Sequence, residues 1–447
     1  MYPVFQTNTV YGVFEHDDVI YRGGWFSLFR WTGSDWETFG GGIGGDTGTL
    51  FAADFTTYGG VLVIGGRFPT AGGTPVYSIA TWDGAVFGAL GGGVDGEIQA
   101  LVTYDGDLIA GGLFDYTGSG PARNIARWDG SGWHPLGSGV YDAIPDGTAD
   151  GVQEMVVWQG DLYVAGDFTH AGGVEVSYVA RWDGSRWSDV GGGVSMIGGG
   201  PTGLRGIDVH EGDLVIVGCM DFAGGVEAIN IARWDGVVWS PVGSGSDPIG
   251  GFLDLRTAAL SVASYGGLLY VGADFSETVG PKAEAIAVWD GRRWRPVGRG
   301  LDYSGWPTGP MVRDLEVCGG SLLMGGIFDE ANNKETDNMA RYTDCDAVAG
   351  SVLEEHLDGP LQVHLSPNPT TASFHYAIRL ERQANVNAVL YDVEGRQIQS
   401  LLNQSLSAGT HSFQDDLDKL GARVGGVYFL RVEAEGSLVT RKLTLIP

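Results

Sequence analysis

Short apolar runs separated by turn residues fill most of this chain. In residues 97–140, "EIQALVTYDG" and "DLIAGGLF" are followed, after a loop, by "IARWDG" and "GWHPLGSG". Runs of about four to eight residues are typical of β-strands, and none of them shows the 3.6-residue period of an amphipathic helix. The pattern therefore predicts four strands and no helix in this segment.

The four-strand pattern repeats along the chain, and one tryptophan marks each copy. The marker residues are Trp31, Trp82, Trp128, Trp182, Trp234 and Trp289, with Tyr342 in the seventh place. Their spacings of 46 to 55 residues, with four short strands per copy, are typical of the blades of a β-propeller. The seventh copy ends after its third strand, near residues 339–342.

The N-terminal sequence "MYPVF" resembles the fourth-strand sequences "WSPVG" and "WRPVG" of two other copies. We expect it to supply the strand that the last copy lacks, because a ring closed by both chain ends leaves no open sheet edge. The sequence therefore predicts an all-β chain in which residues 1–350 form one closed seven-bladed β-propeller.

A second aromatic residue follows each marker after a turn. Asp129-Gly130-Ser131-Gly132 predicts a hairpin loop in which glycine supplies a positive φ, so that Trp128 faces Trp133. Such cross-strand pairs stabilise a sheet by roughly 0.2–1 kcal/mol each. The other pairs are Trp31/Trp36, Trp82/Phe87, Trp182/Trp187, Trp234/Trp239 and Trp289/Trp294.

Eleven of the 14 tryptophans occupy these paired positions, so we interpret them as structural and not as a sugar-stacking surface. We interpret the arginines at one repeated position as ion pairs between blades: Arg127, Arg181, Arg233 and Arg341. With "GGLF" and "NIARWDGSGWHPLGSG" (Gly111 to Gly139), the copies resemble the kelch-like repeats of fungal cortical cell-polarity marker propellers. This resemblance implies a fold and leaves function open.

The composition changes after about Gly350, where the tryptophan repeat ends and glycine becomes rarer. Residues 351–360 read as a polar linker. Residues 361–447 contain further alternating strands with glycine turns, as in a small immunoglobulin-like β-sandwich. This segment is similar to the type A C-terminal sorting domain of the bacterial type IX secretion system. The residues that carry the similarity include Pro367, Asn368, Pro369, Tyr391, Asp392, Gly395, Arg396, Gly426, Tyr428 and Lys442.

The resemblance implies the type IX secretion machinery as a partner, and export to the bacterial cell surface or the extracellular medium. It also implies removal of the sorting domain after export. Such cargo needs a signal peptide for the inner membrane, and the chain shows none. Two explanations stay open: a processed or truncated form, or a sandwich that is only an accessory module.

Charge and composition exclude some partners. The formal net charge is −29, whereas nucleic-acid binding requires a basic surface. No apolar run approaches the roughly 20 residues of a membrane helix. We expect a monomer. Cys219 reads as a small buried hydrophobe, and Cys318 and Cys345 flank the last copy closely enough to leave a disulfide open.

Catalytic motifs are missing: no histidine or cysteine cluster has metal-ligand spacing, and no nucleophile or phosphate-binding motif occurs. In a repeat protein, function is expected where the copies differ. They differ in the connections between blades and in the loops between second and third strands, and strand alternation puts both sets on one face. Because binding residues concentrate on loops held by a rigid framework, this long-loop face is the predicted site.

The long-loop face is acidic, and we expect it to hold Ca²⁺, to bind a cationic partner, or to form a solvated rim. A glycan or protein ligand also fits, because Trp306 either stacks on a sugar or packs over the axial channel. The candidate residues are Asp142, Asp146, Asp150, Asp254, Asp302, Trp306, Asp329 and Glu330. No cofactor motif is present.

Two functions follow from these observations. The leading one is a secreted or surface-displayed, non-catalytic binding or structural propeller with a sorting domain. The alternative is a glycan-active enzyme, a lyase or glycosidase, with carboxylates on the long-loop face. A glycosidase would need two such acids about 5–9.5 Å apart.

Overall fold

The computed structural model describes residues 9–45, 50–142, 151–196, 203–243, 259–273, 285–298, 300–303, 309–318, 320–332, 334–342, 361–366, 373–380, 382–392, 396–416, 426–434 and 437–445. All of their regular secondary structure is β-strand, which confirms the all-β prediction. The chain divides into two compact units, residues 1–344 and 345–447.

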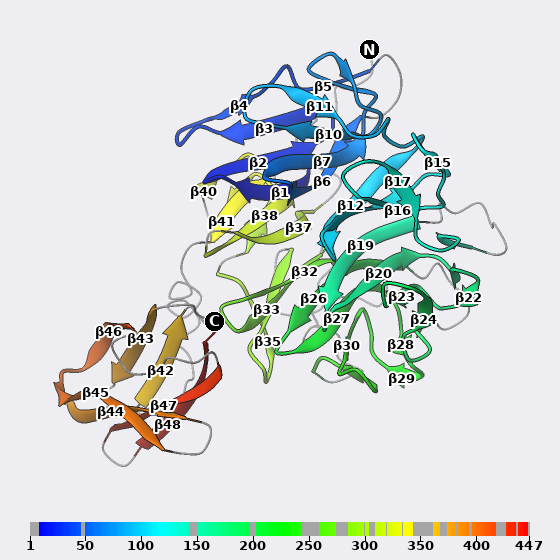
Figure 1. The fold of residues 1–447 in the computed structure, drawn as a ribbon. Helices are drawn as coiled ribbons and strands as arrows, with labels where there is room; N and C mark the ends of the chain where they lie inside the picture. Colours follow the sequence, from blue (N-terminus) through cyan, green and yellow to red (C-terminus); the bar gives the residue numbers. More distant parts are fainter. Residues whose placement is uncertain are drawn as a thin grey trace. The chain divides into compact units, whose positions relative to one another are not determined.

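The described part of the first unit holds seven large antiparallel sheets with one repeated strand order (Figure 1). The first three sheets are β1 (Val10–His16), β2 (Val19–Gly24), β3 (Ser27–Trp31) and β4 (Trp36–Thr38); β6 (Phe51–Tyr58), β7 (Val61–Arg67), β10 (Ile79–Trp82) and β11 (Phe87–Ala89); and β12 (Glu97–Tyr104), β13 (Asp107–Leu113), β16 (Ile125–Trp128) and β17 (Trp133–Pro135). The third sheet confirms the four strands predicted for residues 97–140.

The remaining sheets follow the same order. They are β19 (Gly151–Trp158), β20 (Asp161–Asp167), β23 (Val179–Trp182) and β24 (Trp187–Asp189); β26 (Gly203–His210), β27 (Asp213–Cys219), β30 (Ile231–Trp234) and β31 (Trp239–Pro241); β32 (Ala259–Tyr265), β33 (Leu268–Ala273), β34 (Ile286–Trp289) and β35 (Trp294–Pro296); and β37 (Met311–Cys318), β38 (Ser321–Ile327) and β41 (Met339–Tyr342). The predicted closing strand, residues 1–5, lies outside the described residues.

The first strand of each sheet is the innermost one, and it packs against the first strand of the next sheet (Figure 1). The contacts run in chain order from β1 to β37, and β1 also lies against β37. A small apolar cluster joins the first and last sheets, with Val10, Val13 and Ile20 on one side and Leu323 and Met339 on the other.

Glycine makes these sheet-to-sheet contacts possible. A Cβ atom at Gly65, Gly111 or Gly272, each on the second strand of its sheet, would lie 2.5–2.6 Å from a side-chain carbon of Ile98, Val152 or Val312 on the next sheet. Real Cβ contacts are not this short, so only glycine lets the next inner strand come so close. Gly325 of the last sheet has the same relation to Val10 of the first, at 2.6 Å.

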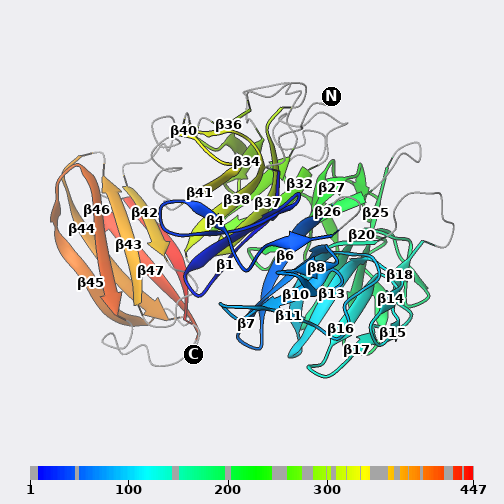
Figure 2. The ribbon, with the colours of Figure 1, turned by 90° about the horizontal axis from the view of Figure 1, so that it is seen from above.

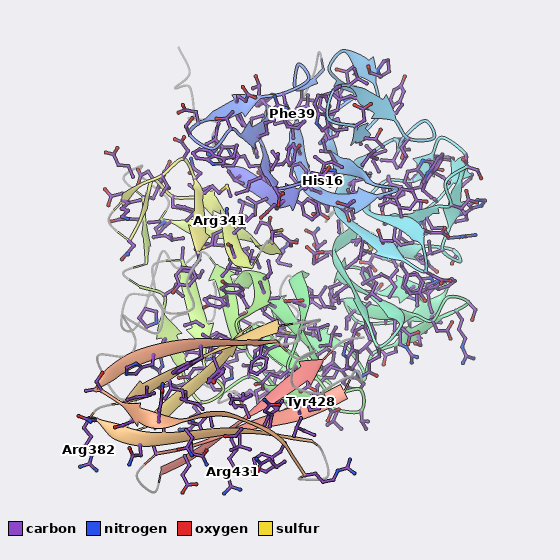
Figure 3. The ribbon with its side chains drawn as sticks, turned by 60° about the vertical axis from the view of Figure 1, so that its left-hand side comes forward. His16, Phe39, Arg341, Arg382, Tyr428 and Arg431 are labelled. Atoms are coloured by element: carbon purple, nitrogen blue, oxygen red, sulfur yellow. The ribbon has the colours of Figure 1, made fainter. Side chains whose placement is uncertain are left out.

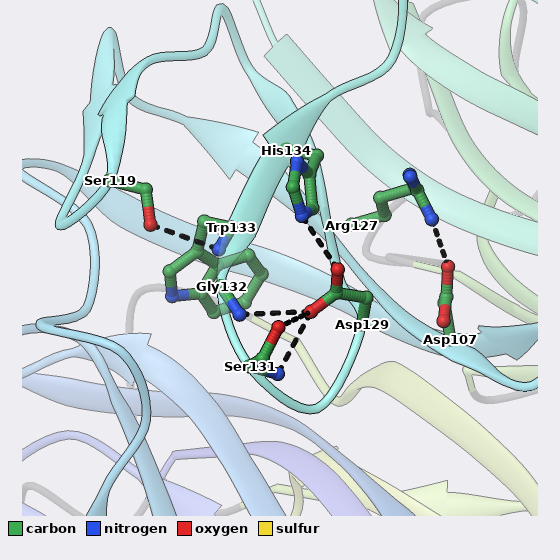
Figure 4. Close-up of polar contacts among 8 residues, drawn as sticks. All are labelled: Asp107, Ser119, Arg127, Asp129, Ser131, Gly132, Trp133 and His134. Atoms are coloured by element: carbon green, nitrogen blue, oxygen red, sulfur yellow. Dashed lines mark hydrogen bonds and ion pairs between the residues drawn. The ribbon is translucent and has the colours of Figure 1, made fainter.

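Each aromatic pair joins the third and fourth strands of its sheet, as predicted. Trp128 faces Trp133 in the strand register, and the ring centroids of the pairs are 4.7–5.5 Å apart. Asp129 holds the hairpin, because its Oδ1 accepts the backbone N–H groups of Ser131 (2.8 Å) and Gly132 (2.9 Å) (Figure 4). The Trp133 indole donates to the Leu90 carbonyl of the preceding sheet at 3.1 Å.

The repeated arginines do not join neighbouring sheets, so that interpretation is wrong. Arg127 pairs with Asp107 on the second strand of its own sheet (Figure 4), and Arg181 pairs with Asp161 in the same way. Arg233 lies 3.6 Å from Asp213, and Arg341 (Figure 3) donates to Ser321 at 3.0 Å. The first residue of the second strand and the residue before the marker aromatic residue therefore meet within one sheet.

The described strands of the second unit form two antiparallel sheets with one apolar core between them (Figure 2). Phe374, Ile378, Val386, Leu390 and Leu430 are among its fully buried side chains. The strands are β42 (Leu361–Ser366), β43 (Ser373–Leu380) and β46 (Gly409–Asp416) in one sheet, and β45 (Gln397–Leu406), β44 (Ala384–Asp392), β47 (Gly426–Ala434) and β48 (Ser437–Leu445) in the other.

A methyl group added at the contact between two consecutive sheets, or at the contact between the last and first sheets, should destabilise the first unit. Gly111→Ala and Gly325→Ala should each lower the free energy of unfolding by about 1–3 kcal/mol, because the added carbon overpacks a filled interface. Gly132→Ala is the control, since its Cβ would meet nothing nearer than 3.7 Å. Denaturant unfolding measures the effect. A neutral Gly325→Ala beside a destabilising Gly111→Ala would contradict the contact between first and last sheets.

Candidate functional site

Both sets of long loops lie at one end of the sheets, because they pair with each other. The connection that leaves one large sheet forms a short strand, which pairs with the loop hairpin of the next large sheet. The short strands are β5 (Ile43–Gly44), β8 (Thr70–Ala71), β9 (Thr74–Pro75), β14 (Tyr116–Thr117), β15 (Gly120–Pro121), β18 (Val140–Tyr141), β21 (His170–Ala171), β22 (Val174–Glu175), β25 (Val194–Ser195), β28 (Phe222–Ala223), β29 (Val226–Glu227), β36 (Leu301–Asp302), β39 (Glu330–Ala331) and β40 (Lys334–Glu335).

Three of the predicted site residues come together on this face. Asp302 of β36 pairs with Glu330 of β39, and the backbone N–H of Asp329 donates to the Asp302 carbonyl at 3.0 Å. Asp142 lies apart from them, after β18, where its carboxylate accepts the Thr169 hydroxyl at 2.6 Å. Four predicted residues lie outside the described chain: Asp146, Asp150, Asp254 and Trp306.

Asp329 and Glu330 line a cleft of about 600 Å³ that sequence analysis did not foresee. Trp31, Asp35 and Trp36 form its other wall, which belongs to the first sheet. We call it the acid–tryptophan cleft; its remaining lining residues are Ser34, Glu335, Thr336, Asp337 and Met339. Five carboxyl side chains and no lysine or arginine line this space.

The cleft borders β41, the last strand of the seventh sheet. β41 pairs with β38 on one edge, and no strand pairs with its other edge within the described residues. In the third to sixth sheets, the second tryptophan of each pair donates its indole N–H to the exit turn of the preceding sheet. The first sheet's Trp36 faces the cleft at the corresponding place, so the cleft lies where a fourth strand of the last sheet would run.

A metal site is not apparent in the described part of the chain, where no group of three or more histidine, cysteine, aspartate or glutamate side chains is arranged to hold a metal ion. Cys318 is a buried free thiol, and Cys219 is a half-buried one. Cys345 lies outside the described residues.

Sequence analysis missed a second group of carboxylates, on the innermost strands. Asp54, Glu154 and Asp314 each follow a β-bulge on the first strand of a sheet, and Asp208 and Glu316 lie two residues after the same point on β26 and β37. The other copies carry Gly12, Ala100, Gly206 and Ser261 after the bulge. Aligning the copies would have found this position, but not the direction in which it faces.

Three of these side chains accept hydrogen bonds from the neighbouring inner strand. Asp54 accepts the N–H of Leu101 at 2.5 Å, and Asp314 accepts the N–H of Val13 at 2.7 Å, which joins the last sheet to the first. Asp208 accepts the N–H of Ser264 at 2.7 Å. Each carboxylate thus satisfies a backbone donor on an edge strand that has no ladder partner on that side.

Burial raises the pKa values of the inner carboxylates by more than these hydrogen bonds lower them. It raises the pKa of Asp314 to about 7, and burial together with the Asp314 charge raises the pKa of Asp54 to about 7. Burial followed by the charge of Asp54 raises the pKa of Glu154 well above its ordinary value. Burial likewise raises the pKa of Asp208 to about 6 and that of Glu316 to about 8, the latter with help from Asp314.

Comparison with known proteins identifies the C-terminal segment. Residues 364–446, which lie within the second unit, match the family described as a secretion system C-terminal sorting domain. This confirms the sorting domain predicted from the sequence, and the protein is therefore located at the bacterial cell surface or outside the cell. No curated protein matches the chain. Within the described residues, no helix has the length and apolar character needed to cross a membrane.

Solved structures similar to the chain share little sequence with it. PorZ, an essential surface component of the type IX secretion system of Porphyromonas gingivalis, is 14% identical with a TM-score of 0.45; the match covers 100% of this chain and 61% of PorZ. Dimeric latent PorU from the same organism is 16% identical (42% and 18% covered, TM-score 0.19). A family 43 arabinoxylan arabinofuranohydrolase from Bacillus subtilis is 9% identical (99% and 96% covered, TM-score 0.28).

The described sorting-motif residues gather near one end of the sheet β45-β44-β47-β48. Asp392 pairs with Tyr428, and Tyr391 shares a cross-strand row with Phe429 and Lys442. Gly426 begins β47, Tyr428 is buried (Figure 3), and Arg396 is exposed just before β45. The remaining motif residues lie outside the described chain: Pro367, Asn368, Pro369 and Gly395.

The inner carboxylates predict an unusual dependence of stability on pH. Because their pKa values are raised in the folded state, the folded chain binds protons that the unfolded chain releases, and stability falls as pH rises from about 5 to 8. The thermal midpoint of the first unit should therefore increase when the pH is lowered from 8 to 5.

Variants identify the source of this dependence. Asp54→Asn and Asp314→Asn should flatten the pH profile, since an amide keeps the acceptor oxygen without titrating. Asp83→Asn is the control, because hydrogen bonds from Val86 and Ala85 hold the pKa of Asp83 below its ordinary value and so outside this pH window. A midpoint that rises with pH in the unaltered protein would contradict the assignment.

Proposed function

We propose that this protein is a non-catalytic binding or structural module that a C-terminal sorting domain carries to the cell surface or the medium. The match of residues 364–446 to the sorting family carries the proposal. Under this proposal, residues 361–447 direct export through the type IX secretion machinery, residues 351–360 are a linker, and residues 1–350 are the exported part.

The proposal includes the closed seven-bladed propeller as the form of the exported part. Three observations support closure: the packing of β1 against β37, the hydrogen bond from Val13 to Asp314, and the fit of Val10 over Gly325. The last two repeat contacts found between other neighbouring sheets. The acid–tryptophan cleft beside β41 is the place where residues 1–5 would complete the seventh sheet.

Removal of the N-terminal segment tests this closure. Deletion of residues 1–7 should lower the thermal midpoint of the first unit, because β41 would keep an open edge and Trp31 and Trp36 would stay partly exposed. Circular dichroism or calorimetry measures the midpoint. The full-length chain with Gln6→Ala and Thr7→Ala serves as a control for altered sequence in the same segment. An unchanged midpoint after deletion would remove the closing strand from the proposal.

A binding role fits the carboxylates better than a catalytic one. Raised pKa values often mark active sites, but Asp54, Asp208 and Asp314 are bonded to backbone N–H groups of neighbouring strands, which explains the positions of these three structurally. Asp302, Asp329 and Glu330 come together on the long-loop face beside the place of the closing strand, and such a group of acids is suited to a cationic ligand. A reducing-sugar release assay separates this role from the glycan-active alternative, since sugar release would exclude a binding-only function.

Export depends on the second unit if the proposal is correct. In a host with a type IX system and a supplied signal peptide, the full chain should reach the surface or the medium, whereas residues 1–350 should stay folded in the periplasm. Cell fractionation with immunoblotting measures both. In the converse experiment, a periplasmic carrier protein fused to residues 351–447 should be exported. Equal export of the full and shortened chains would reduce the second unit to an accessory domain.

A further inference from the structure

A pocket of about 550 Å³ lies between the fifth and sixth sheets, at the end of the sheets that carries the short turns. Its wall on the fifth sheet includes His210, at the end of β26, and Arg233. Its wall on the sixth sheet is the hairpin between β34 and β35 with the tryptophan pair of that sheet. The pocket reaches from this end along the outer strands to the exit turn of the fifth sheet, Pro241 to Gly243, and the function proposed above does not use it.

The pocket exists because one repeat position departs from its usual residue. Tyr58, Tyr104 and Trp158 end the first strand in three other sheets, and each ring lies beside the hairpin glycine of the next sheet, at Gly130, Gly184 and Gly236. His210 occupies this position in the fifth sheet and is smaller. A Cβ atom added to the facing Gly291 would meet nothing within 4 Å.

The facing hairpin departs from the repeat at the same place. Arg292 and Arg293 stand where other hairpins have Ser131-Gly132 or Val237-Val238. His16 and Cys318 also replace the aromatic residue in their sheets, but the hairpins that follow carry Ala85-Val86 and Ser34-Asp35. Among the described hairpins, the one between β34 and β35 is therefore the only one that combines two arginines with a smaller residue on the facing sheet.

The hairpin holds the backbone of the two arginines and leaves their side chains available. Asp290 Oδ1 accepts the backbone N–H groups of Arg292 (2.9 Å) and Arg293 (2.8 Å), while its other oxygen pairs with Arg295. Neither Arg292 nor Arg293 has an ion pair among the described residues. Arg233 is the third arginine of the pocket and lies 3.6 Å from Asp213. Three guanidinium groups therefore line the pocket, together with one carboxylate, that of Glu211.

The tryptophan pair supplies the apolar part of the wall. Trp294 is buried with its indole directed to Val242, and Trp289 stays half-buried with part of its surface facing the pocket. His210 is held by a 2.9 Å hydrogen bond between its Nδ1 and the Ser264 hydroxyl. Burial lowers the pKa of His210, which therefore offers a neutral imidazole.

We propose that this pocket binds an anionic saccharide, in which a carboxylate is attached to a sugar ring. Guanidinium groups bind carboxylates through two parallel hydrogen bonds, and an indole surface matches the apolar C–H face of a sugar. A sugar acid carries a carboxylate and an apolar C–H face in one monosaccharide, and the pocket offers arginine for the first and tryptophan for the second. Local positive charge is notable on a chain of net charge −29 and favours an anion over a neutral sugar.

Isothermal titration calorimetry with trigalacturonate tests the proposal, with neutral galactotriose as the matched sugar. Arg292→Ala/Arg293→Ala should weaken trigalacturonate binding by about tenfold or more, since charge-assisted hydrogen bonds are lost. Arg186→Ala removes an arginine from the position equivalent to Arg293 in the fourth sheet, where Tyr104 lies beside the hairpin, and should leave the affinity unchanged.

His210→Tyr separates shape from charge. It restores the aromatic residue of the repeat, fills the gap opposite Gly291 and keeps every arginine, so it should also weaken binding by about tenfold. Thermal midpoints show whether the variants are folded. If His210→Tyr does not fold, the variant with both exposed arginines replaced by alanine still tests the site. Three results would overturn the proposal: no binding of trigalacturonate, equal binding of galactotriose, or equal binding of hexaglutamate or inorganic phosphate. Each can occur whether or not export depends on the second unit.

Discussion

The close approach of each inner strand to the second strand of the preceding sheet is the contact on which the first unit depends. Gly65, Gly111 and Gly272 leave no room for a side chain, and an Ile or Val of the next sheet fills the space. Van der Waals contact at this distance fixes the spacing of neighbouring sheets. Gly325 and Val10 repeat the relation between the last sheet and the first. Ala165 and Val217 take the equivalent position in the fourth and fifth sheets, so the glycine contact accounts for most junctions between sheets and not for all of them.

That close spacing also explains the inner carboxylates. The first strand of each sheet is an edge strand, and its backbone N–H groups on the inner side have no ladder partner. Neighbouring inner strands are close enough for Asp54 and Asp314 to reach Leu101 and Val13. The same spacing gathers several acids among protein atoms, which raises their pKa values. Stability at high pH is therefore limited by groups that also join the sheets.

Sequence patterns predicted what depends on neighbours along the chain. The strands of residues 97–140, the Asp-Gly hairpin and the Trp128/Trp133 pair all follow from alternation, turn residues and hairpin register. Contacts between side chains on different strands do not follow from these patterns. Arg127 was assigned to a neighbouring sheet, although the residue it meets, Asp107, is only 20 positions earlier. The direction in which Asp54 faces depends on a β-bulge, which shifts the alternation and leaves no mark in the residue pattern.

The copies differ from one another at both ends of the sheets. Long loops vary conspicuously in length, which drew attention to Asp302, Asp329 and Glu330. The short turns keep their length, so differences there are changes of residue type. A histidine at position 210 and two arginines at 292 and 293 are unremarkable singly, because each lies in a different copy. Sheet packing places the end of one copy's first strand against the next copy's hairpin, and only this pairing turns two separate substitutions into one pocket.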